Sequence, residues 1–294
     1  MSLDIIARKH RTRLTSRLRP LPILIYMIVI GVHMIYGSSG YPRIIFQSAI
    51  GRQKPNTIRD DELADACPFC DLSQLPPVIR RDGDIILVRN KYPILKNSDP
   101  YVLIETRECA SELSLYPADK ILRVFRMAFD FWNEMLDSGS YRSIMFIKNH
   151  GPFSGGSLRH PHTQLIGLYD INCEIHLREE SFYGPVIYRQ PGIELNISDS
   201  PRVGFVEFNI LLTDAKAFDA FCLAIQKAVR FVLREFQGGR INSYNLFFHR
   251  FGDLTACTIM PRGATTPIFL GYSIPQVADN LDEIARTFRK AYFS

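Results

Sequence analysis

The stretch GGSLRHPHTQLIGL, residues 155–168, contains the side chains best suited to chemistry. His160, His162 and Gln164 alternate along it, and residues two apart in a strand point to the same face of a sheet. Pro161 separates the histidines and removes one strand hydrogen bond, so we expect the pair at a strand start or edge, next to an opening.

The loop upstream of the histidines, GPFSGGS, is suited to binding phosphate, because its small residues leave backbone N–H groups uncrowded. A neutral imidazole attacks phosphorus well when a hydrogen bond fixes its other nitrogen. Two histidines in a loop are also common as ordinary surface residues. The neighbouring Gly155, Gly156, Ser157 and Gln164 favour a phosphoryl-transfer site over that interpretation.

A second candidate site is the motif C-P-F-C, in which Cys67 and Cys70 have the spacing of metal ligands. The chain has six cysteines at irregular spacings over 294 residues, which does not resemble a disulfide framework. We therefore expect a reducing compartment, in which thiolates remain free to bind a metal. The alternative is that C-P-F-C is a turn without a metal.

The elements that must position these residues follow from hydrophobic periodicity. Apolar residues spaced three and four apart predict helices at 117–136 and 214–236, each ended by a glycine. Runs rich in β-branched residues, bounded by turn residues, predict the strands. These are 84–90, 101–106, 141–149 and the segment HTQLIGL in the first half, then 186–197, 203–212, INSYNLFFH and LTACTIM in the second.

The order strand-strand-helix-strand-loop-strand thus occurs twice, which predicts an α+β fold of two similar halves, each an antiparallel sheet with a packed helix. We place a leader at 1–45, the first half at 46–175 and the second at 185–294, with a linker around 170–185. Where the first half has HPHTQL, the second has TACTIM. Only the first half is expected to be catalytic.

The net charge of +5 comes entirely from the amino terminus, because residues 1–20 carry six basic residues and one acidic residue. No basic stripe remains for a nucleic acid, so we expect no nucleic-acid partner. Residues 21–37 are apolar, about the minimum for a membrane span. A membrane anchor and an over-extended start with Met34 as the true first residue are equally favoured, ahead of a buried helix. We expect a cytoplasmic protein, or one anchored to the membrane through 21–37.

The segment FIKNHGPFSGGSLRHPHTQLIGL resembles the active-site segment of galactose-1-phosphate uridylyltransferase and its relatives in the histidine-triad superfamily. Asn149, the glycine pair, Ser157 and H-P-H-x-Q share order and spacing with that segment. The resemblance extends more weakly from Gly51 to the carboxyl terminus. IGRQKPNTI is similar to a basic nucleotide-contacting strand of those enzymes, and MPRGATTPIFLGYSIPQV to the ending of an uncharacterised bacterial branch.

The resemblance implies that His162 attacks the α-phosphate of a nucleoside diphosphate sugar and forms a covalent nucleotidyl-histidine. It implies that Gln164 and Ser157 bind the phosphate oxygens and that the His160 carbonyl orients His162. It also implies that the nucleoside monophosphate is then passed from His162 to a phosphate acceptor. It also implies a homodimer. Residues implied to bind substrate are Asn149, Gly155, Gly156, Arg52 and Lys54; Arg159 and Arg262 are weaker candidates.

The resemblance also implies a structural zinc ion. Its ligands would be Cys67, Cys70, His160 and Cys109, which stands where the relatives have a histidine; His150 is the alternative ligand. We expect no second metal, because the relatives' downstream H-x-H is missing and His249 stands alone. Histidine-triad hydrolases have a third histidine where this chain has Gln164, which favours transfer over hydrolysis. A hydrolase of nucleotide conjugates and a non-catalytic nucleotide-binding module remain the alternatives.

Overall fold

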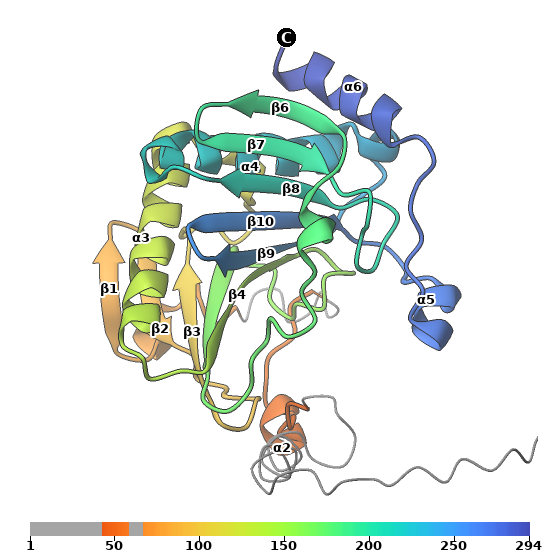
Figure 1. Ribbon diagram of the computed structural model, residues 1–294. Helices are drawn as coiled ribbons and strands as arrows, with labels where there is room; N and C mark the ends of the chain where they lie inside the picture. The colour runs from red at the N-terminus through yellow and green to blue at the C-terminus, as the bar shows by residue number, and fades with distance from the viewer. Residues whose placement is uncertain (1–42, 59–66) are drawn as a thin grey trace, which may run out of the picture. The chain divides into compact units, whose positions relative to one another are not determined.

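Ten strands pair into one antiparallel sheet with the order β1-β2-β3-β5-β4-β9-β10-β8-β7-β6 (Figure 1). The computed structural model describes residues 43–58 and 67–294, and all that follows refers to them. The strands of the first half are β1 (Val78–Asp82), β2 (Ile85–Arg89), β3 (Ser98–Ile104), β4 (Ser143–His150) and β5 (His162–Leu168). Those of the second are β6 (Val186–Gln190), β7 (Ile193–Ile197), β8 (Phe208–Leu212), β9 (Tyr244–Phe251) and β10 (Leu254–Pro261).

The strand order is the same in both halves when each is read toward the middle of the sheet. The first half runs β1-β2-β3-β5-β4 and the second β6-β7-β8-β10-β9, and the two sheets join where β4 pairs with β9. The predicted α+β fold with two similar halves is confirmed. The structure adds that the two antiparallel sheets are continuous with each other.

Helices α3 (Ala118–Asp137) and α4 (Phe218–Arg234) pack on one face of this sheet, α3 against β4 and β5, α4 against β7, β8 and β10. Both bury the apolar stripe that their periodicity predicted. Phe129 of α3 lies edge-to-face against Phe146 and Phe248, so aromatic side chains from both halves meet in one core. Each buried side chain of this kind contributes roughly 1.5–3 kcal/mol.

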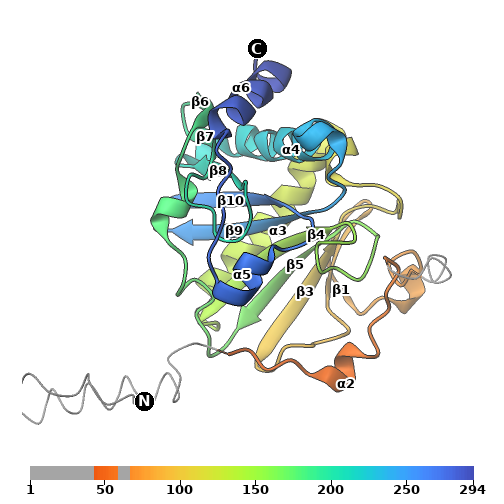
Figure 2. The same cartoon turned by 90° about the vertical axis from the view of Figure 1, so that its right-hand side faces the viewer.

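Three further helices are α2 (Ser48–Gly51), α5 (Pro267–Tyr272) and α6 (Leu281–Tyr292). Figure 2 shows α6 beside β6 and β7 at the edge of the sheet. Its Phe288 is fully buried and stacks on Phe231 of α4 at 4.2 Å between ring centroids. Short 3-10 helices occupy Leu72–Gln74, Leu113–Leu115, Glu179–Phe182, Ala215–Ala217 and Phe236–Gly239.

Two predicted strands are wrong in extent. The segment 186–197 is a hairpin rather than one strand, because Pro191-Gly192 forms its turn and Gly192 has a positive φ of 85°. The strand predicted at 203–212 begins only at Phe208. The residues before it form a loop, in which the Arg202 and Val203 amides donate to the buried carboxylate of Glu207.

The leader predicted at 1–45 and its apolar segment at 21–37 lie outside the described residues, apart from 43–45. In 43–58 and 67–294 we find no helix with the length and hydropathy that a membrane span requires.

Candidate active site and metal centre

His162 is the first residue of β5, a strand that lies between β3 and β4 inside the sheet. The histidine pair therefore sits at a strand start, as the proline predicted, and not at a sheet edge. Pro161 O still accepts a hydrogen bond from the Glu105 amide at 3.1 Å, which continues the β3 pairing beyond His162.

The glycine-rich loop that precedes the histidines is held in one conformation. Gly151 has a φ of +81°, and a Cβ there would lie 2.2 Å from the Asn242 carbonyl oxygen, so only glycine fits. Ser154 Oγ donates to the Gly151 carbonyl at 2.7 Å and accepts from the Gly156 amide. Gly155 has a φ of +80° and open space around it, which leaves this part of the loop accessible to a ligand.

The imidazole of His162 is held in one tautomer. Its Nδ1–H donates to the His160 carbonyl oxygen at 2.8 Å, so Nε2 keeps its lone pair. The side chain is almost fully buried, and burial lowers the pKa of His162 to about 4. The ring is therefore neutral at pH 7 and has the form that a nucleophile needs.

A pocket opens in front of His162. It is lined by residues from the amino-terminal segment, the C-P-F-C loop and strands β2, β3 and β5, among them Lys54, Phe69, Arg89, Tyr92, Val102 and Gln164. Gln164 lies two residues after His162 on the same face of β5. Burial lowers the pKa of Lys54. The pocket thus combines a neutral imidazole, a lysine and an amide with apolar walls, which suits a phosphorylated ligand with an apolar group.

The structure places the other predicted substrate-binding residues differently: Ser157 and Asn149 lie beside the glycine loop, Arg52 lies outside the pocket, and Arg262 supports the loop. Ser157 Oγ is buried and has no hydrogen-bond partner among residues 43–58 and 67–294, so it can accept a bond from a ligand or donate one. Asn149 Oδ1 accepts from Asn245 Nδ2 at 2.6 Å beside the glycine loop. Arg52 is exposed and is not among the pocket-lining residues. Arg262 Nε donates to the Phe153 carbonyl and so supports the loop.

Cys67, Cys70, Cys109 and His160 come together from three separate segments, with all four ligand atoms within 4.8 Å of one another. His160 Nδ1 lies 3.6 Å from Cys67 Sγ and 3.5 Å from Cys70 Sγ. A tetrahedral zinc with ordinary bond lengths separates sulfur and nitrogen ligands by about 3.6 Å. His160 Nε2–H donates to the Thr106 carbonyl at 2.7 Å, which leaves Nδ1 free to bind a metal. This cluster could hold a metal such as zinc.

The pKa values of the thiols in the cluster also favour a bound cation. Burial raises the pKa of Cys67, but the neighbouring His160 ring and the Phe69 amide outweigh it and lower that pKa to about 7. Burial and the neighbouring sulfurs raise the pKa of Cys109 to about 12. A metal ion removes this repulsion between the sulfurs, because it binds them as thiolates.

The two remaining histidines of interest lie elsewhere. His150, the alternative ligand, stacks on Tyr244 with ring centroids 5.0 Å apart, while Cys109 occupies the fourth corner of the cluster. His249 is on β9, where its Nε2 lies 3.3 Å from Arg202 Nη1 and its ring lies edge-on to Phe182. His249 is therefore a strand residue within the second half.

The sequence interpretation missed Phe69, which joins the metal cluster to the pocket. Its ring lies edge-on to His160 at 5.8 Å and to His162 at 5.5 Å. It comes from the middle of C-P-F-C, so the loop that supplies two thiols also contacts His162. An apolar residue between two metal-ligand cysteines gave no signal of this role.

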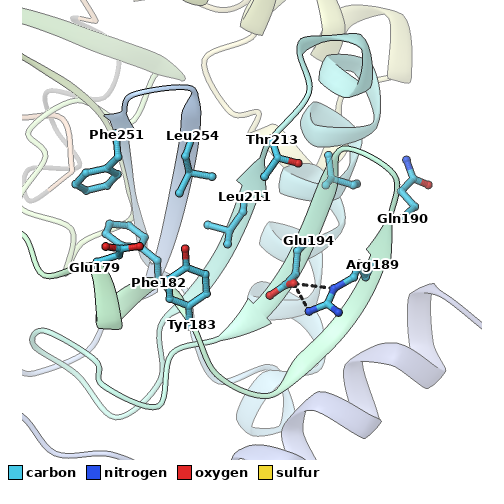
Figure 3. A pocket seen from close by; sticks show the side chains of 11 residues that line it. Glu179, Phe182, Tyr183, Arg189, Gln190, Glu194, Leu211, Thr213, Phe251 and Leu254 are labelled. Atoms are coloured by element: carbon cyan, nitrogen blue, oxygen red, sulfur yellow. Dashed lines mark hydrogen bonds and ion pairs between the residues drawn. The ribbon is translucent and has the colours of Figure 1, made fainter.

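A second hollow lies on the second half of the sheet (Figure 3). The β-bulges and turns of the β1–β2 and β6–β7 hairpins match when Val88 is set against Asn196, so the row Val88, Val102 and Gln164 of the first half corresponds to Asn196, Asn209 and Thr258 in the second. The hollow is lined by Glu194 and Leu211, which lie two residues along β7 and β8 from that row. Ala256 consequently stands where the first half has His162. Glu194 accepts from Arg189 in the hollow, where Phe182, Leu211 and Phe251 contribute apolar side chains and none of the described histidines lines the surface.

Family models described as "Domain of unknown function (DUF4931) N-terminal domain" and "Domain of unknown function (DUF4931) C-terminal domain" match residues 46–171 and 174–293. The chain belongs to this family. A DUF4931 family protein of known structure from Bacillus cereus ATCC 10987 is 35% identical, with a TM-score of 0.68 over 74% of this chain and 100% of that one. No curated protein matches the chain.

More distant structures share the fold of this DUF4931 family member. An ADP-glucose phosphorylase from Arabidopsis thaliana, solved with bound ADP-glucose, is 17% identical, with a TM-score of 0.61 over 76% of this chain and 90% of that one. A GalT-like protein from Arabidopsis thaliana is 16% identical, with a TM-score of 0.62 over 86% and 100%. The resemblance to the galactose-1-phosphate uridylyltransferase branch is thus confirmed at the level of the fold.

Proposed function

We propose that the protein is a nucleotidyltransferase that moves a nucleoside monophosphate from a nucleoside diphosphate sugar to a phosphate or sugar 1-phosphate, with His162 as the nucleophile. The observation that carries this proposal is the neutral imidazole of His162, fixed through Nδ1 and placed in a pocket with Lys54 and Gln164. The shared fold with an ADP-glucose phosphorylase supports a nucleotide sugar as the substrate class.

The reaction has two displacement steps. The Nε2 lone pair of His162 forms a P–N bond to the α-phosphorus, and the P–O bond to the β-phosphate breaks. The bridging oxygen keeps the electron pair and leaves as sugar 1-phosphate. A phosphate oxygen of the acceptor then attacks the same phosphorus, and the electrons of the P–N bond return to Nε2. Lys54, the Gln164 amide and the Ser157 hydroxyl would stabilise the charge on the phosphoryl oxygens.

Zinc bound by Cys67, Cys70, Cys109 and His160 would have a structural role. With all four protein ligands it has no open position for a substrate. It would cross-link the C-P-F-C loop to the backbone of His160, whose carbonyl orients His162. The homodimer implied by the resemblance remains a prediction.

Trapping the covalent intermediate tests the reaction. The protein is mixed with ADP-glucose or UDP-glucose labelled at the α-phosphate, and intact mass is measured with and without phosphate or glucose 1-phosphate. We expect a nucleotide adduct on His162 that disappears when the acceptor is added. Without acceptor, the adduct should persist in water for much longer than one turnover takes. Release of nucleotide at a rate independent of acceptor would show a hydrolase, and absence of any adduct would reject both enzymatic functions.

Gln164→His tests why the intermediate resists water. A glutamine amide cannot exchange a proton with an attacking water molecule, whereas a histidine can act as an acid or base, an effect of typically 10²–10⁴-fold. We expect the variant to hydrolyse its adduct at least about tenfold faster than the native protein. Gln164→Asn, which shortens the side chain but keeps the amide, should not show that gain.

The pH dependence of adduct formation tests the state of the nucleophile. Burial disfavours the imidazolium and lowers the pKa of His162 to about 4, so the neutral ring persists well below the ordinary value of 6.5. The single-turnover rate, measured from pH 3.5 to 8 at saturating nucleotide, should therefore stay flat down to about pH 5. Circular dichroism at each pH separates loss of the nucleophile from unfolding. A midpoint near 6.5 contradicts a buried neutral imidazole.

A further inference from the structure

A buried ion pair lies on the other face of the sheet, behind the nucleophile. Lys148 Nζ is 2.7 Å from Glu105 Oε1, and the two side chains are 2% and 0% exposed. Lys148 follows Ile144 and Phe146 on the helix-covered face of β4, and Glu105 follows Leu103 beyond the end of β3. His162 faces the pocket on the opposite side.

The pair bonds to three consecutive residues of the chain around the nucleophile. Glu105 Oε1 accepts from Thr163 Oγ1 at 2.6 Å, Lys148 Nζ donates to the His162 carbonyl at 3.3 Å, and the Glu105 amide donates to the Pro161 carbonyl at 3.1 Å. Tyr116 OH donates to the other carboxylate oxygen at 3.2 Å. These bonds fix the backbone on both sides of the His162 Cα.

Stability does not account for such a pair. Moving two charges into a protein interior carries a desolvation cost that their attraction often fails to exceed, and apolar residues of similar volume commonly serve the fold as well or better. The carboxylate of Glu105 is nevertheless charged: burial raises its pKa, but Lys148 and the Thr163 hydroxyl together outweigh this effect and lower the pKa below its usual value. A charged pair at this position therefore calls for another role.

The second half of the chain provides a comparison. Ile147 pairs with Gln164, and Phe247 pairs with the equivalent Thr258, so Phe248 stands where the first half has Lys148. Phe248 is buried and stacks on Phe146 with ring centroids 4.0 Å apart. Leu212, which corresponds to Glu105, is buried in the same apolar core. The half without a nucleophile thus uses the same two positions for other contacts.

We propose that Lys148 and Glu105 are positioning residues, which hold the backbone of residues 161–163 so that Nε2 of His162 points at the substrate phosphorus. This inference rests on the proposed function of His162 and adds a part to it. The pair touches no substrate, and its side chains act through His162 and Thr163. A misplacement of about 1 Å at a reacting atom lowers a rate by about 10²-fold.

The experiment replaces the pair by apolar residues of similar size, in the double variant Lys148→Met/Glu105→Leu, in the full-length protein. Nucleotide affinity and the single-turnover rate of adduct formation are measured separately with ADP-glucose or UDP-glucose. We expect affinity within about threefold of the native value and a rate about 10²-fold lower. Arg250→Met, on β9 and outside the pocket lining, should leave both unchanged.

A spectroscopic readout separates this inference from the proposed reaction. Nitrogen-15 NMR of the imidazole reports which ring nitrogen carries the proton, and the missing signal in His162→Gln assigns the resonance. We expect one tautomer, protonated at Nδ1, in the native protein and a mixture of both in the double variant. This result does not require turnover, so it holds or fails even where no adduct forms.

A native rate of adduct formation and an unchanged tautomer in the folded double variant would overturn the proposal. Where the double variant does not fold, Thr163→Val decides, because it removes one bond from the carboxylate and leaves the ion pair intact. We expect a five- to tenfold lower rate with native affinity and a native melting temperature. A native rate in Thr163→Val then overturns the proposal.

Discussion

His162→Ala is expected to abolish formation of the nucleotide adduct and to lower turnover by roughly 10⁴- to 10⁶-fold, because removal of a covalent nucleophile leaves only binding and charge stabilisation. Lys54, Gln164 and the glycine loop remain in the variant, so nucleotide affinity should stay within about threefold. Intact-mass spectrometry gives the adduct, and titration calorimetry with ADP-glucose or UDP-glucose gives the affinity.

His176→Ala is the matched control, since His176 is exposed and is not among the pocket-lining residues. It should form the adduct at the native rate. Two results contradict the assignment of His162: an adduct that forms at the native rate in His162→Ala, or an adduct that peptide mapping places on another residue of the native protein. Equal loss in both histidine variants would indicate a general defect.

Removal of the metal is expected to have the second large effect, a loss of stability of the folded protein. A metal present at a thousand times its dissociation constant stabilises the folded protein by about 4 kcal/mol. For a chain of this size, that corresponds to about 10 °C in melting temperature. Cys67→Ser, or the native protein dialysed against a chelator, should lose one equivalent of zinc and melt about 10 °C lower. Metal content is measured by mass spectrometry of the elements and melting by calorimetry.

Two variants show whether the effect belongs to the cluster. Cys109→His offers another good zinc ligand at the position where the relatives have histidine, and should keep the metal. Cys173→Ser changes a cysteine outside the cluster and should be neutral. A native protein purified under reducing conditions without any bound metal, and with a melting temperature that chelator does not change, rules out a structural metal.

Much of the first half could be predicted because its signals are local. Strand β5 and helix α3 follow from the spacing of their apolar residues, and the cradle before His162 follows from Gly151 and Gly155, both of which have positive φ. Cys109 was placed beside Cys67 and Cys70 only through the resemblance, because no spacing rule connects residues so far apart. The structure brings these cysteines together with His160.

Other features of the fold could not be predicted from local sequence patterns. Strand β1 was not predicted, since it is an edge strand with exposed residues on both faces and therefore has no apolar alternation. The Lys148–Glu105 pair joins residues 43 positions apart. A signal for it was present all the same: Lys148 has the same strand parity as Ile144 and Phe146, so an inward-facing lysine needed a buried partner.

The pairing of β4 with β9 suggests how a chain with one reactive centre could arise from a symmetrical ancestor. Two separate copies of the first half could close the same sheet through a β4–β4 contact, and that assembly would have two nucleophiles. When the two copies are joined in one polypeptide, only one of them has to keep its reactive histidine. The other copy still has to pair with the edge strand of its neighbour. Alanine at position 256, where the first half has His162, is what such a division of labour permits: this half supports the sheet without a histidine of its own at that place.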